Sequence, residues 1–232
     1  YGGYPDAMEE AWKLFRKTAY SSLYSYPRFT WQTVIPDQRR ISKIDHSDDY
    51  LQAIRLYASC ADELKSSELY RNDLIEFVSY YVAAKAENFY KQALKDDLEN
   101  RVLAAQRNLQ QTVDLLMDVD RLLASHPLYR LEEWVELARN SGTTLQEKDA
   151  YEANAKRLIT SWGGIQEDYA ARFWSGLIKD YYIPRIQLYF TKDRDKIREW
   201  EEQWITSPWS NSTTPFDDPV KAALNLIEKT NK

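Results

Sequence analysis

The stretch from Glu68 to His126 reads ELYRNDLIEFVSYYVAAKAENFYKQALKDDLENRVLAAQRNLQQTVDLLMDVDRLLASH and contains neither glycine nor proline. Because these two residues interrupt helices, their absence over such a length favours long helices. Apolar residues recur there at helical spacing, at Leu74, Phe77, Val78, Tyr81 and Val82, and then every seven residues at Val102, Leu109, Leu116 and Leu123, with Ala105 and Val119 between them. The stretch therefore predicts long packed helices at the centre of the fold.

One unbroken helix over this stretch would be on the order of 80 Å long at 1.5 Å per residue. The apolar stripe weakens between Lys95 and Glu99, so we predict a break or bend there. Pro127 stops the second helix, and a short helix around Leu131 to Ala138 ends before Gly142, which is a typical C-cap signal.

On the N-terminal side, Pro5 at a first helical position predicts a helix over about 5–19. Ser47 is predicted to cap a second helix, whose apolar face comprises Leu51, Ile54, Ala58 and Ala61. The connection from Tyr20 to His46 is too long for an ordinary turn and rich in aromatic residues. We predict that it is a packed loop.

On the C-terminal side, a helix over 145–161 is predicted to run out at Trp162-Gly163-Gly164. Its expected buried face consists of Tyr151, Ala155, Leu158 and Ile159. A further helix from about 168 carries Trp174, Leu177, Ile178 and Tyr181, and it bends or restarts at Pro184. Two more helices follow. One contains Ile197, Trp200 and Trp204, and the other starts at Pro219. No segment sustains the alternation of a strand, so we expect a single all-α domain over 1–232, an irregular multi-helix bundle with long central helices.

The composition excludes several function classes. Net charge is −5, which gives no basic footprint, so we expect no nucleic-acid partner. No apolar run approaches the roughly 18 residues needed to span a bilayer, so we expect a soluble chain without a membrane partner. Cys60 is the single cysteine, which excludes an internal disulfide and predicts a buried, inert thiol. The chain starts at Tyr1 rather than methionine, and we expect it to be part of a longer protein.

The usual motifs of catalysis are missing from the sequence. His46 and His126 are far apart and each lies at a helix boundary, where an exposed or capping imidazole is expected. Metal-ligand spacings, the nucleophile elbow and the phosphate-binding loop are all absent. Acidic pairs such as Asp96-Asp97 and Glu201-Glu202 point apart on a helix and are expected to form solvated faces. We therefore predict no catalytic residue, metal site or cofactor in this chain.

The tryptophan before the glycine pair is different, because a helix that ends in Trp-Gly-Gly can display an indole ring. Sugars stack an apolar face on such rings while nearby polar groups bind their hydroxyls. Trp162 could serve in this way, beside Gln166, Glu167, Asp168 and Tyr169. The alternative is that Gly163 ends the helix and Trp162 packs beneath it in the core.

Several segments together resemble one known family. YEANAKRLITSWGG at 151–164 and DYAARFWSGLIKDYYIPR at 168–185 resemble the C-terminal helical domain of the α-N-acetylglucosaminidases, glycoside hydrolases that act on terminal α-linked N-acetylglucosamine. YGGYPDAMEEAWKLF at 1–15, YRNDLIEFV at 70–78, LLMDVDRLLASHP at 115–127 and LEEWVELAR at 131–139 resemble further elements of that domain in the same order. The chain departs from the family at Ile186, where a tryptophan is common.

The resemblance implies a division of labour between domains. In the family a (β/α)₈ barrel supplies two glutamates, a nucleophile and an acid/base, and the helical domain packs beside it to complete the sugar pocket. Trp162 would then form a wall of the pocket, Asp168 and Tyr169 would line or support it, and structural roles would belong to Trp174, Tyr181, Tyr182 and Arg185.

The expected partners are therefore the catalytic barrel of the same polypeptide and the terminal N-acetylglucosamine of glycans. The chain alone should be inactive. The resemblance implies a periplasmic or extracellular location if the source is bacterial, and a lysosomal one if it is animal. Two alternatives stay open from the residues: a free-standing helical module that binds another protein, and an independent carbohydrate-binding domain.

Overall fold

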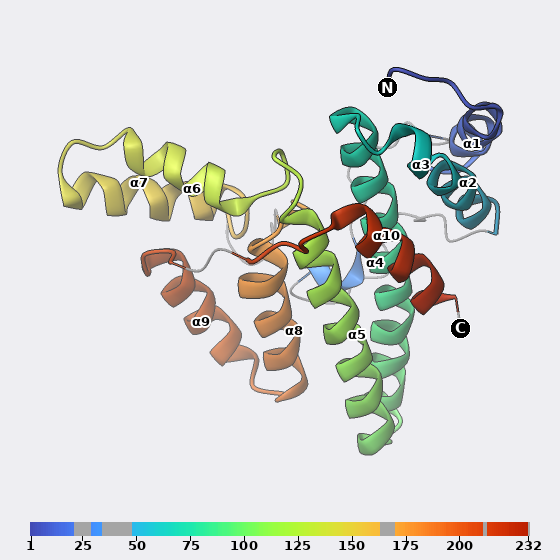
Figure 1. Ribbon diagram of the computed structural model, residues 1–232. Coiled ribbons are helices and arrows are strands. Elements are labelled where there is room, and N and C mark those ends of the chain that lie inside the picture. The colour runs from blue at the N-terminus through green and yellow to red at the C-terminus, as the bar shows by residue number, and fades with distance from the viewer. Residues whose placement is uncertain (21–28, 34–47, 163–169, 211–212, 232) are drawn as a thin grey trace.

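Helices α4 (Glu68–Leu98) and α5 (Val102–Leu123) form the centre of the computed structural model, which describes residues 1–20, 29–33, 48–162, 170–210 and 213–231 (Figure 1). The two helices lie side by side as a long antiparallel hairpin. Their buried faces contribute Leu74, Val78, Val82, Leu116 and Val119 to the core. The predicted long central helices are confirmed.

Local chemistry explains where α4 starts and stops. The Ser67 hydroxyl accepts the backbone N–H of Tyr70 and caps the first turn. At the other end Asn100 adopts a positive φ of 58°, a conformation that asparagine tolerates. The predicted break is confirmed, although α4 continues through Leu98 before the chain turns.

Asp96 contradicts the solvated position predicted for the acidic pairs, and His126, predicted to be either exposed or capping, is not exposed. The Asp96 side chain is buried, and its carboxylate accepts hydrogen bonds from Gln92, Arg101 and Asn108 across the α4–α5 turn. His126 is also buried, and its Nδ1 accepts the backbone N–H of Leu128 at 3.1 Å, which stabilises the turn after α5. Both groups are buried because the tertiary fold supplies them with hydrogen-bond partners.

Aromatic side chains join the N-terminal helices to the centre. Helix α1 (Asp6–Lys17) packs on α2 (Asp48–Ser59), and α2 contacts α4 and the short α3 (Ala61–Leu64). Phe15 stacks on Phe77 with ring centroids 4.1 Å apart. Cys60 is buried after α2, and burial raises the pKa of its thiol, so the prediction of a buried cysteine is confirmed. Ser47, the predicted cap of α2, lies outside the described residues.

The described part of the predicted packed loop is a buried anchor, residues 29–33. It contains the 3₁₀ helix η1 (Thr30–Gln32), and Trp31 is fully buried. The backbone N–H of Thr30 donates to both carboxylate oxygens of Glu87 on α4, at 2.9 and 3.1 Å. The prediction of packing is therefore confirmed for residues 29–33.

Helices α6 (Leu131–Asn140) and α7 (Leu145–Leu158) form a hairpin that projects from the body (Figure 1). A capping box between Thr144 and Glu147 starts α7. The predicted buried face of α7 is partly wrong, because Tyr151 and Leu158 are exposed. Glu152 and Lys156 are buried instead, since α7 turns these two residues toward α6 and α9.

Gly142 ends the turn after α6 for a reason other than the predicted one. It does not adopt the left-handed conformation of a helix C-cap glycine, unlike Gly176 at φ 82°. A Cβ atom on Gly142 would lie 2.7 Å from the backbone nitrogen of Lys148. The close approach of α7 therefore requires glycine here.

Gly142→Ala is expected to destabilise the chain by about 1–3 kcal/mol, because the added methyl group meets backbone rather than a side chain that can move. Urea denaturation measures the change in the free energy of unfolding. Ser141→Ala, at the neighbouring exposed position, is the control and should change it by less than about 0.5 kcal/mol. Equal effects of the two substitutions would contradict the steric explanation.

The helix predicted from about 168 starts later. The described residues 170–174 are irregular, and the backbone N–H of Ser175 donates to the Tyr129 carbonyl at 2.8 Å. A five-residue π-helix, η3 (Ile178–Tyr182), leads into α8 (Ile183–Phe190) at Pro184, which confirms the predicted restart. The late start follows from Gly176, whose positive φ ends the extended segment.

Helices α9 (Arg194–Thr206) and α10 (Pro219–Thr230) complete the fold, and both predictions for them are confirmed. α9 packs on α7 and α8, while α10 crosses the central hairpin and contacts α4 (Figure 1). The only strand-like pairing among the described residues is one isolated bridge between Arg130 and Ser175. The all-α class is therefore confirmed.

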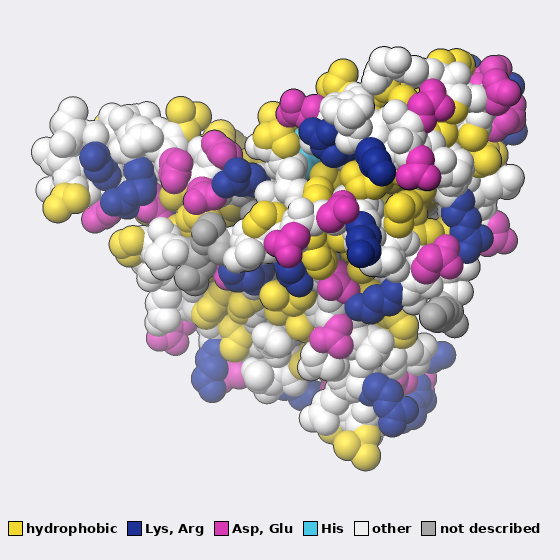
Figure 2. Space-filling view, viewed as in Figure 1, with side chains coloured by type: hydrophobic (Ala, Val, Ile, Leu, Met, Phe, Trp, Pro, Cys, Tyr) yellow, Lys and Arg dark blue, Asp and Glu magenta, His cyan; other side chains and the backbone are white. Residues whose placement is uncertain are grey.

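The surface mixes charge with isolated apolar side chains. Figure 2 shows positive and negative side chains interspersed with hydrophobic ones over the visible face. Leu98 and Leu103, on either side of the α4–α5 turn, are both exposed. None of the helices in the described ranges is both long enough and apolar enough to cross a bilayer.

Candidate functional site

Trp162 lies just beyond α7, at the end of a short turn, and 52% of its surface is exposed. The alternative that this ring packs in the core is therefore wrong. Asp168 and Tyr169, together with Gly163, Gly164, Gln166 and Glu167, lie outside the described residues. The site is accordingly built from Trp162 and from the two described flanks, residues 152–162 and 170–182.

The turn that carries Trp162 is attached to the body by the residues just before it. Ile159 and Thr160 are buried, and the Thr160 hydroxyl donates to the Lys156 carbonyl at 2.7 Å. The Arg157 guanidinium forms a two-pronged pair with Glu202 of α9, at 2.6 and 2.9 Å. A bidentate pair of this kind restricts orientation as well as distance.

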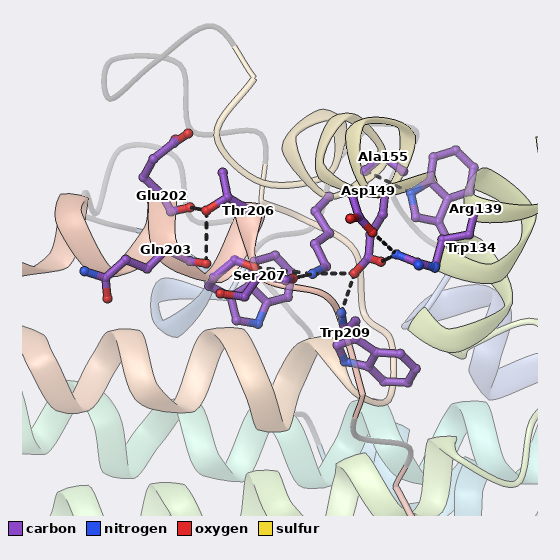
Figure 3. A network of polar contacts seen from close by, with 12 residues as sticks. Trp134, Arg139, Asp149, Ala155, Glu202, Gln203, Thr206, Ser207 and Trp209 are labelled. Carbon is purple, nitrogen blue, oxygen red and sulfur yellow. Dashed lines mark hydrogen bonds and ion pairs between the residues drawn. The ribbon is translucent and has the colours of Figure 1, made fainter. Parts of the chain in front are cut away.

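A buried charge network lies one turn earlier on α7 (Figure 3). One oxygen of Glu152 accepts from Arg139 of α6 at 2.6 Å, and the other pairs with the Lys156 ammonium at 2.7 Å. The Trp209 backbone N–H also donates to Glu152. Lys156 donates to the Ser207 carbonyl at 2.5 Å, and burial lowers the pKa of its ammonium despite the nearby carboxylate.

The other flank of the site is held by the buried anchor at 29–33. The Arg172 carbonyl accepts from the Tyr182 hydroxyl at 2.9 Å and from the Gln32 side-chain amide at 3.4 Å. Phe173 is buried and packs against Phe29, with ring centroids 6.0 Å apart. Residues far apart in the sequence therefore position the segment that follows residue 169.

Asp120 of α5 organises the turn before η3. Its carboxylate accepts the backbone N–H groups of Gly176 at 2.8 Å and Lys179 at 3.0 Å, and the hydroxyl of Thr213 at 2.5 Å. Burial raises the pKa of Asp120, and burial likewise raises the pKa of Asp180 to about 6. Because backbone N–H groups satisfy its carboxylate, Asp120 can be buried, and its role is to hold the turn in place.

Arg185 has the structural role that was expected of it. It is 1% exposed, and its guanidinium donates to Glu201 at 2.9 Å, to the Tyr181 hydroxyl at 3.0 Å and to the Gln32 carbonyl at 2.6 Å. Tyr181 and Tyr182 are fully buried beside it, whereas Trp174 is half-buried under the guanidinium of Arg172. Glu201 is buried as well, so its predicted solvated position is wrong.

The exposed ring of Trp162 and a nearby shallow hollow are features of a binding surface. No group of three His, Cys, Asp or Glu residues in the described ranges could hold a metal ion. A shallow hollow of ≈ 380 Å³ lies between α6 and α7, lined in part by Trp134, Tyr151 and Leu158. An exposed indole can stack on one face of a sugar, but a second surface is needed to enclose the ring.

Sequence reasoning missed the residues that hold the site in place. Glu152 and Lys156 have the i, i+4 spacing that normally indicates an exposed helical pair. The local pattern of Gln32 accounts only for its hydrogen bond from the backbone N–H of Phe29. Its other partners, Arg172 and Arg185, are more than a hundred residues away in the sequence, and no local pattern indicates them. The one available signal for the α7 pair was its place within the segment that carries the family resemblance.

Comparison with known sequences shows what the chain is similar to. The family model described as "Alpha-N-acetylglucosaminidase (NAGLU) C-terminal domain" matches residues 1–229. A human alpha-N-acetylglucosaminidase is 28% identical over 215 residues, which cover 86% of this chain and 28% of the human protein. The chain therefore spans less than a third of the length of this relative.

Solved structures show the same fold. A family 89 glycoside hydrolase from Clostridium perfringens in complex with PUGNAc superposes with a TM-score of 0.83 at 22% identity, covering 98% of this chain and 30% of that one. A variant from the same organism, in complex with its substrate GlcNAc-alpha-1,4-galactose, gives the same TM-score, identity and coverage. At this identity the likeness establishes the fold.

Proposed function

The chain belongs to the family of alpha-N-acetylglucosaminidase C-terminal domains, and from this premise we propose that it is the accessory helical domain of an exo-acting, retaining α-N-acetylglucosaminidase. It packs on a catalytic (β/α)₈ barrel of the same polypeptide and completes the pocket for a terminal α-linked N-acetylglucosamine. Acting alone, the chain does not hydrolyse glycosides.

One observation carries this proposal: Trp162, which matches the tryptophan of the family's Trp-Gly element, has an exposed indole in the turn just beyond α7. Trp162 is 52% exposed, whereas Trp31 is fully buried. The lengths of the relatives add support, because a chain that spans less than a third of them fits a domain of a larger enzyme. A free-standing interaction module, or an independent sugar-binding domain, explains that proportion less well.

The proposed mechanism assigns the chemistry and the binding to different domains. The barrel supplies two carboxylates, one attacking the anomeric carbon and one protonating the leaving oxygen, so that the configuration is retained after hydrolysis. Trp162 supplies an apolar wall that orients the sugar and excludes water from one face. Asp168 and Tyr169 are proposed to line or support the same pocket.

Trp162→Ala in the full-length protein is expected to lower kcat/KM by about tenfold, mainly through KM, because loss of one stacking wall removes about 1.4 kcal/mol of binding. Steady-state hydrolysis of an aryl α-N-acetylglucosaminide measures this change. The melting temperature should stay within about 2 °C of the parent, since the ring is exposed.

Tyr4→Ala is the matched control, because it removes another exposed aromatic ring that lies outside the candidate site. It should leave both kcat and KM unchanged within about twofold. If Trp162→Ala behaves like this control, Trp162 is no part of a sugar pocket.

The compartment belongs to the same proposal: export to the periplasm or the medium for a bacterial source, or delivery to the lysosome for an animal one. Both are places where glycans are degraded outside the cytosol.

A further inference from the structure

The end of α7 is joined to α9 by four charged residues, Glu152, Lys156, Arg157 and Glu202, which we call the α7–α9 clamp. Two of its members, Glu152 and Lys156, are 1% exposed, whereas Arg157 and Glu202 form the outer pair at the surface. All four are described by the structure. Glu152, Lys156 and Arg157 lie within ten residues of Trp162 in the sequence, and Glu202 pairs with Arg157.

Lys156 holds a specific point on α9. Its ammonium donates to the carbonyls of Trp204 at 3.3 Å and Ser207 at 2.5 Å, at the C-terminal end of that helix. A cation is favourable there because the last carbonyls of a helix lack partners and carry partial negative charge. The Lys156 ammonium also lies 5.1 Å from the centre of the Trp204 ring.

Glu152 fixes Lys156 from the opposite side and brings in two more elements. It joins Arg139 of α6 and the backbone of Trp209, which follows α9, to the same ammonium group (Figure 3). The lysine is therefore surrounded by directional partners from α6, α7 and the end of α9. Such a network specifies one arrangement of the helices, whereas apolar side chains of similar volume would also pack in shifted ones.

The clamp is connected to Trp162 through a short, buried stretch of backbone. The Lys156 carbonyl accepts the backbone N–H of Ile159 at 3.2 Å and the hydroxyl of Thr160 at 2.7 Å. Both of these residues are buried, so the stretch of backbone between the clamp and Trp162 is packed into the body of the domain. Trp162 is the first large exposed side chain after this turn.

We infer that the α7–α9 clamp sets the position of the Trp162 indole, with Lys156 and Glu152 as positioning residues for sugar binding. This inference rests on the proposed function, since it assumes that Trp162 contacts the sugar. Neither residue touches the substrate. They affect KM indirectly, because they set the orientation of the end of α7 and therefore of the Trp162 ring.

Lys156→Met in the full-length protein tests the inference, because methionine fills similar space without the directional bonds. KM for the aryl glycoside should rise about fivefold while kcat changes by less than about twofold. Arg157→Ala, at the exposed half of the clamp, should raise KM about threefold, and it tests the inference if Lys156→Met fails to fold.

Asp96→Asn is the matched control for Glu152→Gln. Both substitutions convert a buried, hydrogen-bonded carboxylate to an amide, but Asp96 lies at the α4–α5 turn, away from α7 (Figure 1). Glu152→Gln should raise KM, whereas Asp96→Asn should lower the melting temperature without changing KM. A rise in KM for both would show that general loss of stability is the cause and would overturn the inference.

A double-mutant cycle gives the decisive readout, because residues that act through one another are not additive. If Lys156 acts through Trp162, Lys156→Met should have no further effect on KM once Trp162 is alanine. An undiminished fivefold effect in that background overturns the inference alone. A Trp162→Ala variant with normal KM overturns the proposed function, so the two failures can be told apart.

Discussion

Arg185→Met is expected to lower the free energy of unfolding by about 3–5 kcal/mol, the usual cost of removing one partner from a buried ion pair. The guanidinium is 1% exposed and bonds to Glu201, to the Tyr181 hydroxyl and to the Gln32 carbonyl. Its removal leaves a buried carboxylate and a buried carbonyl without their cationic donor. The loss is therefore larger than the net contribution of the pair itself.

Thermal denaturation should show a fall in melting temperature of about 10 °C for a domain of this size. The double variant Arg185→Met with Glu201→Gln should recover part of the loss, because the uncompensated charge disappears. Arg185→Lys should be destabilised as well, because the single ammonium of lysine cannot replace the planar guanidinium, which donates to acceptors in different directions. An Arg185→Met variant as stable as the parent would contradict the role of Arg185 in the core.

Trp31→Ala is expected to cost about 3–5 kcal/mol, as large-to-small changes of fully buried aromatic residues do. The ring has no exposed surface, stacks on Phe29 at 4.9 Å and meets Tyr182 edge-on at 5.4 Å. Removing it opens a cavity between η1 and the end of η3. Urea denaturation at constant temperature measures the loss.

The same substitution at Trp162 is the internal control for Trp31. Trp162→Ala should change the free energy of unfolding by less than about 1 kcal/mol, because the ring is half exposed. One tryptophan is thus expected to affect stability and the other activity. If Trp162→Ala lowered the free energy of unfolding strongly and Trp31→Ala did not, Trp162 would be the core residue and Trp31 would not.

Both large effects concern the anchor at 29–33. Arg185 bonds to the carbonyl of Gln32, and the Gln32 side chain in turn bonds to the carbonyl of Arg172. Damage at Arg185 or Trp31 should therefore also loosen the flank that follows the proposed pocket. We expect activity of these two variants to decline with stability, in contrast to the clamp variants.

Local patterns were sufficient for the long helices of this fold, although the helix predicted from about 168 starts later than its pattern indicated. The stretch from 68 to 126, without glycine or proline, determined the central helices, and Pro184 and Pro219 marked a restart and a start that the structure confirms. These features depend on propensity and on residues a few positions away, so a single sequence displays them. The sequence left the exposure of Trp162 open between a displayed ring and a ring packed in the core, and only the structure shows that it is exposed.

Only the tertiary structure decided which polar groups are buried. Asp96, Glu152, Lys156 and Glu201 have the sequence context of surface residues, yet all are buried because partners from other helices satisfy them. The two described glycines at element ends show the same division. Gly142 was predicted as a C-cap, but the close approach of α7 explains it instead. Gly176 lies inside the helix predicted from about 168, and only the structure shows that its positive φ delays the start of that helix. Burial of charge depends on hydrogen bonds between segments distant in the chain, which no local pattern encodes.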